Sequence, residues 1–336
     1  MSQKTSSRTA GSFGLRLWKS PWPTVGWEIS QFGIGVARWL VGSGEFEGIS
    51  WKPVPPGAVE ASPLRENFLQ PEEVNKALAA ALAPLGLPAS NGSSPLRDVV
   101  LVIPDQAARL FVLQFDAFPR QPAEALALVK WRLKKSVPFD MDSAAVSFLV
   151  QPAMGQWEVT AVATSRAVIR QYEALAENFG LRPRWVTLST LASLELLRGT
   201  GSKEKGSPGP SGVLVAKYSP PWLTIAILQG ESLRLFRTVP LPASADGMVS
   251  PAEALEALYP SVAYFQDSFQ SPLETAYLCG LGESGAVVAE SLERELQLRV
   301  QPLLEGLDRE GDNLDPHQRE WHFAALYGMV QGQARR

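Results

Sequence analysis

The sequence predicts an α/β protein of two lobes, with a small α/β module inserted into the first lobe. Apolar runs typical of strands alternate with segments of helical periodicity along most of the 336 residues. Residues 199–212, GTGSKEKGSPGPSG, contain no apolar side chain that could anchor them, so they predict a linker. We expect a flexible tail at 1–22, a first lobe at 23–198 with the module at about 106–165, and a second lobe at 213–331.

The first lobe is predicted to begin with a β-hairpin. Residues 25–40 read VGWEISQFGIGVARWL, with apolar residues on both sides of a turn at 30–33. Residues 42–69 are rich in Gly, Pro and Ser and predict a short strand with loops. A helix is expected to begin at Pro71, and the apolar run DVVLVIP at 98–104 predicts a buried central strand.

One helix is expected to organise the inserted module. Pro122 suits a first helical turn, and Pro138 is expected to end the helix. Four apolar side chains share one side at helical spacing and predict a core contact: Leu126, Val129, Leu133 and Val137. Leu128 and Trp131 fall on the opposite side, flanked by Arg132 and Lys135. That side is either a contact surface for a partner or ordinary core covered by a neighbouring strand.

Strands and helices continue the pattern on either side of this helix. Strands at 108–115, 144–151 and 157–164 complete the module. They are followed by a helix at 166–180 with Gly180 at its C-terminal cap, a strand at 183–188, and a helix opened by Ser189 or Thr190 as N-cap.

The second lobe opens with three predicted strands in residues 213–241, with turns at 219–221 and 229–230. A helix over 250–269 is expected to be interrupted or kinked near Pro260. Residues 274–296 predict a strand, a Gly-rich turn and a helix, and residues 317–330 predict the last helix.

Composition restricts the function classes. The formal net charge of -3 offers no long-range attraction for nucleic acid or for an anionic membrane. A single cysteine, Cys279, excludes an internal disulfide and fits a reducing compartment. No apolar run approaches the roughly 20 residues that a spanning helix needs. The two histidines, His317 and His322, do not share a helical face, which argues against a metal site.

The order of motifs resembles the PilM family of type IV pilus assembly proteins, which are actin-like and related to the division protein FtsA. The resemblance is carried by ALALVKWRLKKSVPFDMDSAAVSF at 125–148, EVTAVAT at 158–164 and RAVIRQYEALAENFGLRPRWVTL at 166–188. It extends over about 25–330 and is most specific between 99 and 197. The resemblance implies an actin-like ATPase fold of two ribonuclease-H-like lobes, with the inserted module typical of this family and a reduced second-lobe insertion, since only residues 243–250 separate the second-lobe hairpin from its next helix.

The same resemblance implies a nucleotide site that has lost its key groups. Glu28 stands where the first phosphate loop has Asp, and Ser30 stands where it has Gly. In the second loop the Asp position falls on Ala216 or Lys217, and two prolines follow that have no N–H for a phosphate. Gly280 and Gly282 resemble the adenosine loop. Each lost charge-assisted contact forfeits about 1.5–3 kcal/mol, so ATP and Mg²⁺ binding, possible in the family, is expected to be weak or absent.

Two functions follow from the resemblance. The first is a non-catalytic scaffold at the inner membrane, cytoplasmic and peripheral, that captures the N-terminal tail of a single-pass, PilN-like partner and joins other assembly proteins. The tail is expected in a groove between the first lobe and its module, near Leu128, Trp131, Arg132, Lys135 and Phe139. The second is an ATP-dependent enzyme of the same fold, an ATPase or a sugar kinase. No catalytic or metal-binding residue, no cofactor and no nucleic-acid partner is predicted, and self-association stays open.

Overall fold

The computed structural model describes residues 22–87, 97–153, 155–197, 211–242, 249–304 and 316–334. Several predicted segments lie wholly or largely outside these ranges: the N-terminal tail, the loop at 89–95, the linker at 199–212 and the short connection at 243–250.

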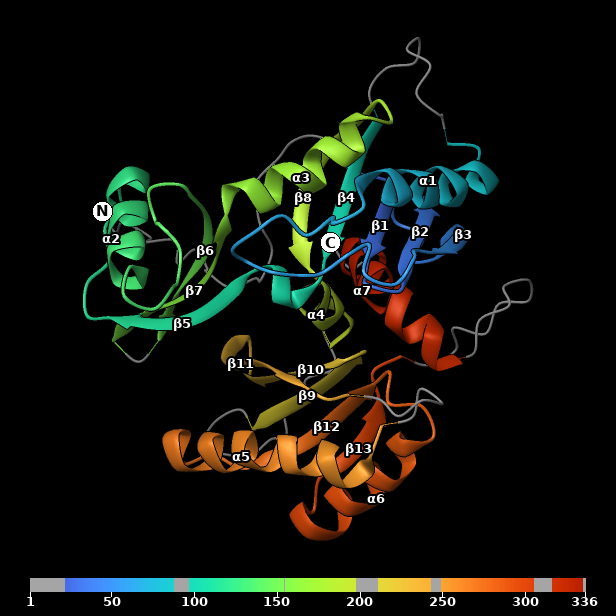
Figure 1. Ribbon diagram of the computed structural model, residues 1–336. Helices are drawn as coiled ribbons and strands as arrows, with labels where there is room; N and C mark the ends of the chain where they lie inside the picture. Colours follow the sequence, from blue (N-terminus) through green and yellow to red (C-terminus); the bar gives the residue numbers. More distant parts are fainter. Residues whose placement is uncertain are drawn as a thin grey trace, which may run out of the picture.

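Two five-stranded sheets form the two lobes (Figure 1). The first contains β1 (Val25–Ile29), β2 (Gly33–Trp39), β3 (Phe46–Pro53), β4 (Arg97–Ile103) and β8 (Leu181–Leu188), and the second contains β9 (Gly212–Ser219), β10 (Trp222–Gln229), β11 (Ser232–Pro240), β12 (Leu273–Cys279) and β13 (Arg299–Pro302). The strand orders are β3-β2-β1-β4-β8 and β11-β10-β9-β12-β13. In each sheet three antiparallel strands are followed by two parallel ones. The duplicated ribonuclease-H-like topology is therefore confirmed.

The first lobe buries one face of its sheet beneath two helices, α1 (Pro71–Leu82) and α3 (Arg166–Glu177). Apolar residues of α1, such as Leu78, and of α3, such as Tyr172, share one core with Trp27 of β1 and Leu101 of β4. The short helix η1 (Ala83–Leu85) extends α1.

The second lobe has the same layering. Helices α5 (Pro251–Phe269) and α6 (Ser284–Leu296) cover the outer face of its sheet. Phe265 of α5 and Leu292 of α6 are fully buried in that core. The helix α5 is continuous through Pro260, so no interruption is present there.

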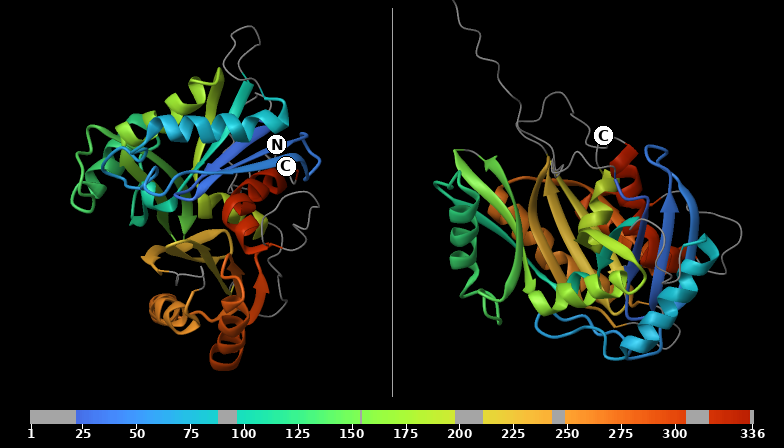
Figure 2. Two further views of the ribbon diagram at one scale, coloured as in Figure 1. Left: turned by 45° about the vertical axis from the view of Figure 1, so that its right-hand side comes forward. Right: turned by 90° about the horizontal axis from the view of Figure 1, so that it is seen from above.

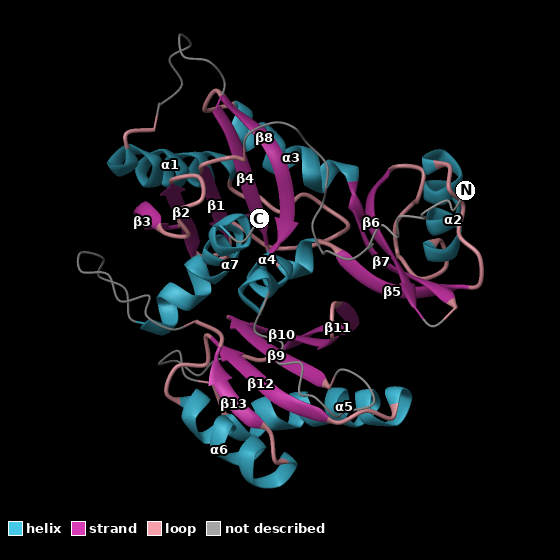
Figure 3. Cartoon of the chain, turned by 180° about the vertical axis from the view of Figure 1, so that it is seen from behind, coloured by secondary structure: helices cyan, strands magenta, loops and turns pink. Residues whose placement is uncertain are grey.

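The inserted module is a three-stranded antiparallel sheet with one helix on it. The strand order is β5 (Arg109–Phe115), β7 (Gln156–Ser165), β6 (Ala144–Ala153), and α2 (Pro122–Leu133) covers one face. Val129 and Leu133 of α2 pack on alternate strand residues such as Val159 and Ala161. Figures 2 and 3 show the module at one end of the molecule, with α2 on its outer side.

The helix α7 (Pro316–Ala334) joins the two lobes. Its residues Phe323, Leu326 and Val330 pack on the inner face of the first sheet, against Trp39 and other residues. Ala324 lies in a further cluster with residues of the second sheet. The helix was expected to belong to the second lobe alone, but it packs mainly on the first.

Two helix boundaries differ from the prediction. The helix α2 ends at Leu133, because Lys134 and Ser136 continue as turns and Pro138 disfavours helical geometry in the residue before it. Ser189 and Thr190 lie inside α4 (Ser189–Ser193), which is followed by η3 (Leu194–Leu197), and neither is the N-cap. The strand β13 was not predicted, since four residues give too short a pattern.

Candidate functional site

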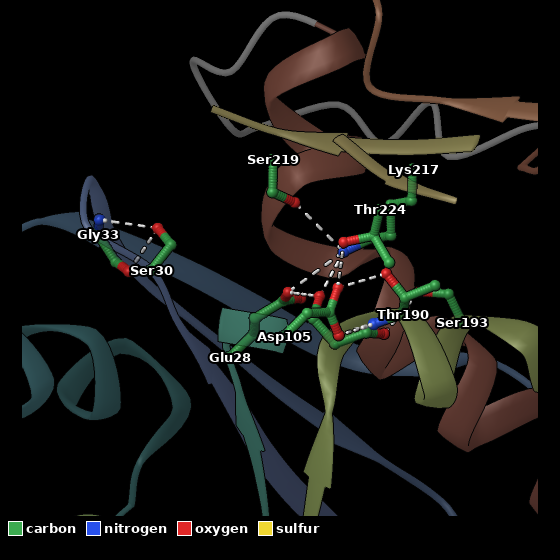
Figure 4. Close-up of polar contacts among 10 residues, drawn as sticks. Glu28, Ser30, Gly33, Asp105, Thr190, Ser193, Lys217, Ser219 and Thr224 are labelled. Atoms are coloured by element: carbon green, nitrogen blue, oxygen red, sulfur yellow. Dashed lines mark hydrogen bonds and ion pairs between the residues drawn. The ribbon is translucent and has the colours of Figure 1, made fainter. Parts of the chain in front are cut away.

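The hairpin between β1 and β2 uses its own amide groups internally. Ser30 Oγ accepts hydrogen bonds from the N–H groups of Phe32 and Gly33, each at 3.2 Å. In the phosphate loop that the resemblance implies, such N–H groups would face a phosphate. Ser30 therefore fills the amide cradle from within (Figure 4).

Glu28 and Lys217 meet between the lobes. Glu28 lies in β1 and Lys217 in β9, the equivalent first strands of the two sheets. Lys217 Nζ lies 3.5 Å from Glu28 Oε1, and the two side chains are only 1% and 4% exposed. The Ser189 hydroxyl donates to the same oxygen of Glu28 and accepts from Lys217. Figure 4 shows Glu28 and Lys217 pointing toward each other from the two lobes. A buried ion pair thus stands where the resemblance places metal-binding acids.

Asp105 makes a second polar contact between the lobes. It lies in η2 (Asp105–Ala107), directly after β4, and its carboxylate accepts from the Thr190 N–H at 2.9 Å and from the Thr190 hydroxyl at 2.5 Å. It also accepts from the Thr224 hydroxyl of β10 at 2.9 Å. Asp105 therefore satisfies an N-terminal amide of α4 and ties that helix to the second lobe.

Burial and pairing set the pKa values of this cluster. Burial raises the pKa of Glu28, while Lys217 and the Ser189 hydroxyl oppose that rise. Burial alone would lower the pKa of Lys217, but the charge of Glu28 and its other acidic neighbours hold it above its usual value. Lys217 is therefore protonated at neutral pH and places a fixed cation between the lobes.

The second hairpin contacts the first directly. Pro220 and Pro221 form the turn between β9 and β10, and proline has no N–H to offer an anion. The Gln31 side chain at the tip of the first hairpin donates to the Pro220 carbonyl at 3.0 Å. The two loops between which a triphosphate would lie are bonded to each other.

The Gly280 turn is occupied by α7. The Gly280 N–H donates to the Glu320 carboxylate, and its carbonyl accepts from the Trp321 indole at 2.7 Å. A Cβ on Gly280 would lie 2.3 Å from the Tyr218 carbonyl oxygen, so the close approach requires glycine. Gly282 begins the turn into α6, where its carbonyl accepts from the N–H of Gly285 at 3.0 Å.

These residues do not fit a magnesium triphosphate. Of the two candidates for the second acid, Ala216 is buried in the second-lobe core and Lys217 faces the first lobe, so a cation stands where a metal ligand is required. The hairpin amides are engaged by Ser30 or replaced by prolines. In the described ranges, no group of three or more His, Cys, Asp or Glu residues is placed to hold a metal ion.

A groove of about 370 Å³ separates the module from the first lobe. Its walls are α2, the beginning of β6, and α3, and its lining residues are Leu126, Lys130, Ala144, Ala145, Val146, Arg166, Ile169, Arg170 and Glu173. The lining therefore combines three cations, Lys130, Arg166 and Arg170, with one carboxylate, Glu173, and with apolar side chains such as Leu126 and Ile169. Burial raises the pKa of Glu173, with Glu177 adding to the rise and Arg170 opposing it.

The two sheets of equivalent strand order, together with the inserted module, identify the fold. The chain has the actin-like fold. A solved structure described as the PilM-PilN type IV pilus biogenesis complex aligns with a TM-score of 0.65 and 17% identity over 94% of this chain and 98% of that one. The cytoplasmic domain of EpsL, an inner-membrane component of the type II secretion system of Vibrio cholerae, aligns with a TM-score of 0.50 and 13% identity over 93% of this chain and 94% of that one.

No protein-family model matches the sequence, and no curated protein matches it either. At these identities the two structural likenesses establish the actin-like fold alone.

The residues predicted to bind a partner lie outside the groove. Trp131 is 71% exposed, so the alternative in which a strand covers it is wrong. Leu128, Arg132 and Lys135 do not line the groove either, and Phe139 packs, partly buried, on the module core. The groove meets the flank of α2 that carries Leu126, which was assigned to the core. Partner binding by the predicted five residues remains a prediction.

Sequence reasoning also missed the partners of Glu28. A lysine within the apolar strand VLVAKYS and a glutamate within VGWEIS were each noted as lost nucleotide contacts. A buried lysine requires a buried acid as its counter-charge, so the sequence could have predicted that Lys217 and Glu28 pair with each other. Asp105, Thr190 and Thr224 gave no such signal, because single polar residues after strands are common.

None of the described helices is both long and apolar enough to cross a membrane.

Proposed function

We propose that the protein is a non-catalytic actin-like scaffold of a type IV pilus or related secretion machine. One observation carries the proposal: the buried Lys217 and Glu28 pair between the equivalent first strands of the two lobes. Placing Mg²⁺ and a triphosphate there would require removing a fixed cation and breaking the contacts of Ser189. That cost argues against the second candidate, an ATPase or sugar kinase, which needs an intact Mg²⁺ site and a catalytic base nearby.

We further propose that the scaffold captures the N-terminal tail of a single-pass, PilN-like inner-membrane protein. The support is the similar PilM-PilN complex, together with the groove between α2, β6 and α3. Its apolar lining residues, such as Leu126 and Ile169, suit an apolar side chain of a peptide. Lys130, Arg166 and Arg170 suit peptide carbonyls or a carboxylate. On this proposal the protein is cytoplasmic and peripheral to the membrane through its partner.

Capture of the N-terminal peptide of a single-pass inner-membrane protein encoded beside this chain tests the proposal. Ile169 is half-buried and lines the groove, so Ile169→Glu should place a charge in its apolar lining and weaken peptide binding at least tenfold. Fluorescence anisotropy of a labelled peptide measures the affinity.

Ala167→Glu is the matched control, because Ala167 lies on the same helix, is exposed and does not line the groove. Its affinity should equal that of the unaltered chain. Equal binding by all three chains would mean that the tail binds elsewhere. Weaker binding by Trp131→Ala with normal binding by Ile169→Glu would assign the tail to the predicted face of α2 instead.

A further inference from the structure

The outward face of α2 takes part neither in the polar contacts between the two lobes nor in the lining of the groove. We define the Trp131 face as Leu128, Trp131, Arg132, Lys134 and Lys135. Trp131 is 71% exposed, the largest exposed fraction among the large hydrophobic side chains of the described residues. The half-buried Leu128 lies one turn before it on α2, and the exposed Lys134 and Lys135 follow directly after the end of the helix at Leu133.

The charge around Trp131 is positive and unpaired. Arg132, Lys134 and Lys135 form no ion pair within the part of the chain that the structure describes. The nearest acid on the same side of α2 is Glu124, which lies about 10 Å away along the helix axis toward its N-terminus. Two acids follow the helix, the exposed Asp140 and Asp142.

The Asp140 carboxylate forms hydrogen bonds within its own loop. Its carboxylate accepts from the N–H groups of Asp142 at 3.2 Å and of Ser143 at 3.1 Å. These bonds come first among the causes that lower the pKa of Asp140, and the charge of Lys134 adds a smaller effect. Neither Asp140 nor Asp142 forms an ion pair with Arg132, Lys134 or Lys135 among the described residues, so these cations remain available to an external anion.

The small size of this face favours contact with a lipid bilayer surface over contact with a folded protein partner. The helix α2 has 12 residues, about 18 Å of length, and stands at the outer side of the module (Figures 1 and 3). A stable protein interface buries about 800 Å² per partner, more than one helix with a single protruding aromatic ring offers. A lipid headgroup layer needs only an amphipathic aromatic and flanking cations, because indole partitions to the interface and cations bind lipid phosphates.

We propose that the Trp131 face binds the surface of an anionic lipid bilayer. Trp131 inserts at the headgroup level, and Arg132 and Lys135 contact the phosphates on either side. The net charge of -3 does not oppose this contact, because charges beyond about 8–10 Å are screened at physiological salt. The inference does not depend on the proposed peptide, since it uses a different side of α2 from the groove.

Sedimentation of the purified full chain with vesicles tests this proposal. Vesicles of phosphatidylglycerol mixed with phosphatidylcholine should bind the protein, and pure phosphatidylcholine vesicles should bind it much more weakly. Trp131→Ala should reduce binding to the mixed vesicles on the order of tenfold, since part of an aromatic surface returns to water. Arg132→Ala combined with Lys135→Ala should reduce it about 25-fold, since each cation near an anionic surface contributes about fivefold.

Tyr264→Ala is the matched control, because Tyr264 is a 53% exposed aromatic on α5 of the other lobe. Its vesicle binding should be unchanged. Circular dichroism verifies that each variant is folded. Unchanged vesicle binding by Trp131→Ala, or equal binding to neutral and anionic vesicles, would overturn the proposal. The proposal also fails if the face captures an acidic polypeptide while the protein ignores anionic vesicles.

Discussion

Lys217 supplies the counter-charge of Glu28 between the two lobes. Its ammonium group neutralises Glu28 in a site with almost no solvent contact, and Ser189 bridges the two. An isolated charge in such a site would be very costly, so the two residues are stable only as a pair. The positive charge that pairs with Glu28 between the lobes is thus supplied by a side chain, Lys217.

Replacing Lys217 alone should destabilise the protein, because Glu28 then has no counter-charge. Lys217→Met leaves a buried carboxylate without a counter-charge, so the free energy of unfolding should fall by about 3–5 kcal/mol. Urea denaturation measures the change. The double variant Lys217→Met with Glu28→Gln should recover much of the loss, because the stranded charge is gone. A single variant as stable as the unaltered chain would contradict the proposed energetics.

His322 should make the protein sensitive to acid. It is buried on α7 beside Trp51, with ring centroids 5.1 Å apart, and burial lowers its pKa to about 3. The unfolded chain binds this proton near pH 6.5, so the stabilising contribution is present above that pH and is lost as the pH falls toward 3. At about pH 4 the loss amounts to about 3 kcal/mol.

The variant His322→Gln isolates this contribution. The difference in urea midpoint between neutral pH and about pH 4 should be smaller in the variant than in the unaltered chain. Carboxyl groups with raised pKa values, such as Glu28 and Glu320, are common to both proteins and cancel in the comparison. An identical acid response in the two proteins would show that His322 does not titrate in this way.

At the scale of elements, local patterns identified the strands and helices but not their long-range contacts. Apolar residues on both sides of a turn located β1 and β2, and the Gln229-Gly230 turn located the hairpin of β10 and β11. Helical periodicity located α2 but assigned Leu126 to the core, whereas Leu126 is half-buried and lines the groove toward α3. Ser189 and Thr190 fit an N-cap pattern, yet Asp105 from another element caps the helix instead.

The module is held from the second lobe as well as from the first. Arg234 of β11 forms an ion pair with Glu158 of β7, which is 1% exposed. The same guanidinium donates to Gln229 at 3.1 Å and lies 5.1 Å from the Phe269 ring centre. One arginine thus connects the module sheet to two elements of the other lobe.

Arg234→Met should loosen the module without unfolding either lobe. Backbone amides of β5, β6 and β7 should exchange hydrogen faster, because Glu158 loses its counter-charge and the sheet loses its contact with β11. Hydrogen exchange with mass spectrometry measures this. Arg237→Met is the control, since Arg237 is exposed on the same strand and has no ion pair in the described residues. Equal exchange in the two variants would remove Arg234 from this role.

At the scale of the whole molecule, the two lobes are closed upon each other by side chains of the chain itself. The Gln31 to Pro220 bond, the Glu28 to Lys217 pair and the contact of α7 with Gly280 all involve segments that the resemblance assigns to the nucleotide site. The resemblance predicted two lobes and weak nucleotide binding. It could not predict that the losses compensate each other, because that depends on which side chains of separate lobes face one another.

Isothermal titration calorimetry with Mg-ATP tests this account most directly. The unaltered chain should give no binding heat up to about millimolar nucleotide, which bounds the binding free energy at about -4 kcal/mol or weaker. The same protein should be folded and bind its peptide partner without nucleotide. A micromolar dissociation constant for Mg-ATP would contradict the closed cleft and restore the enzyme as the better explanation.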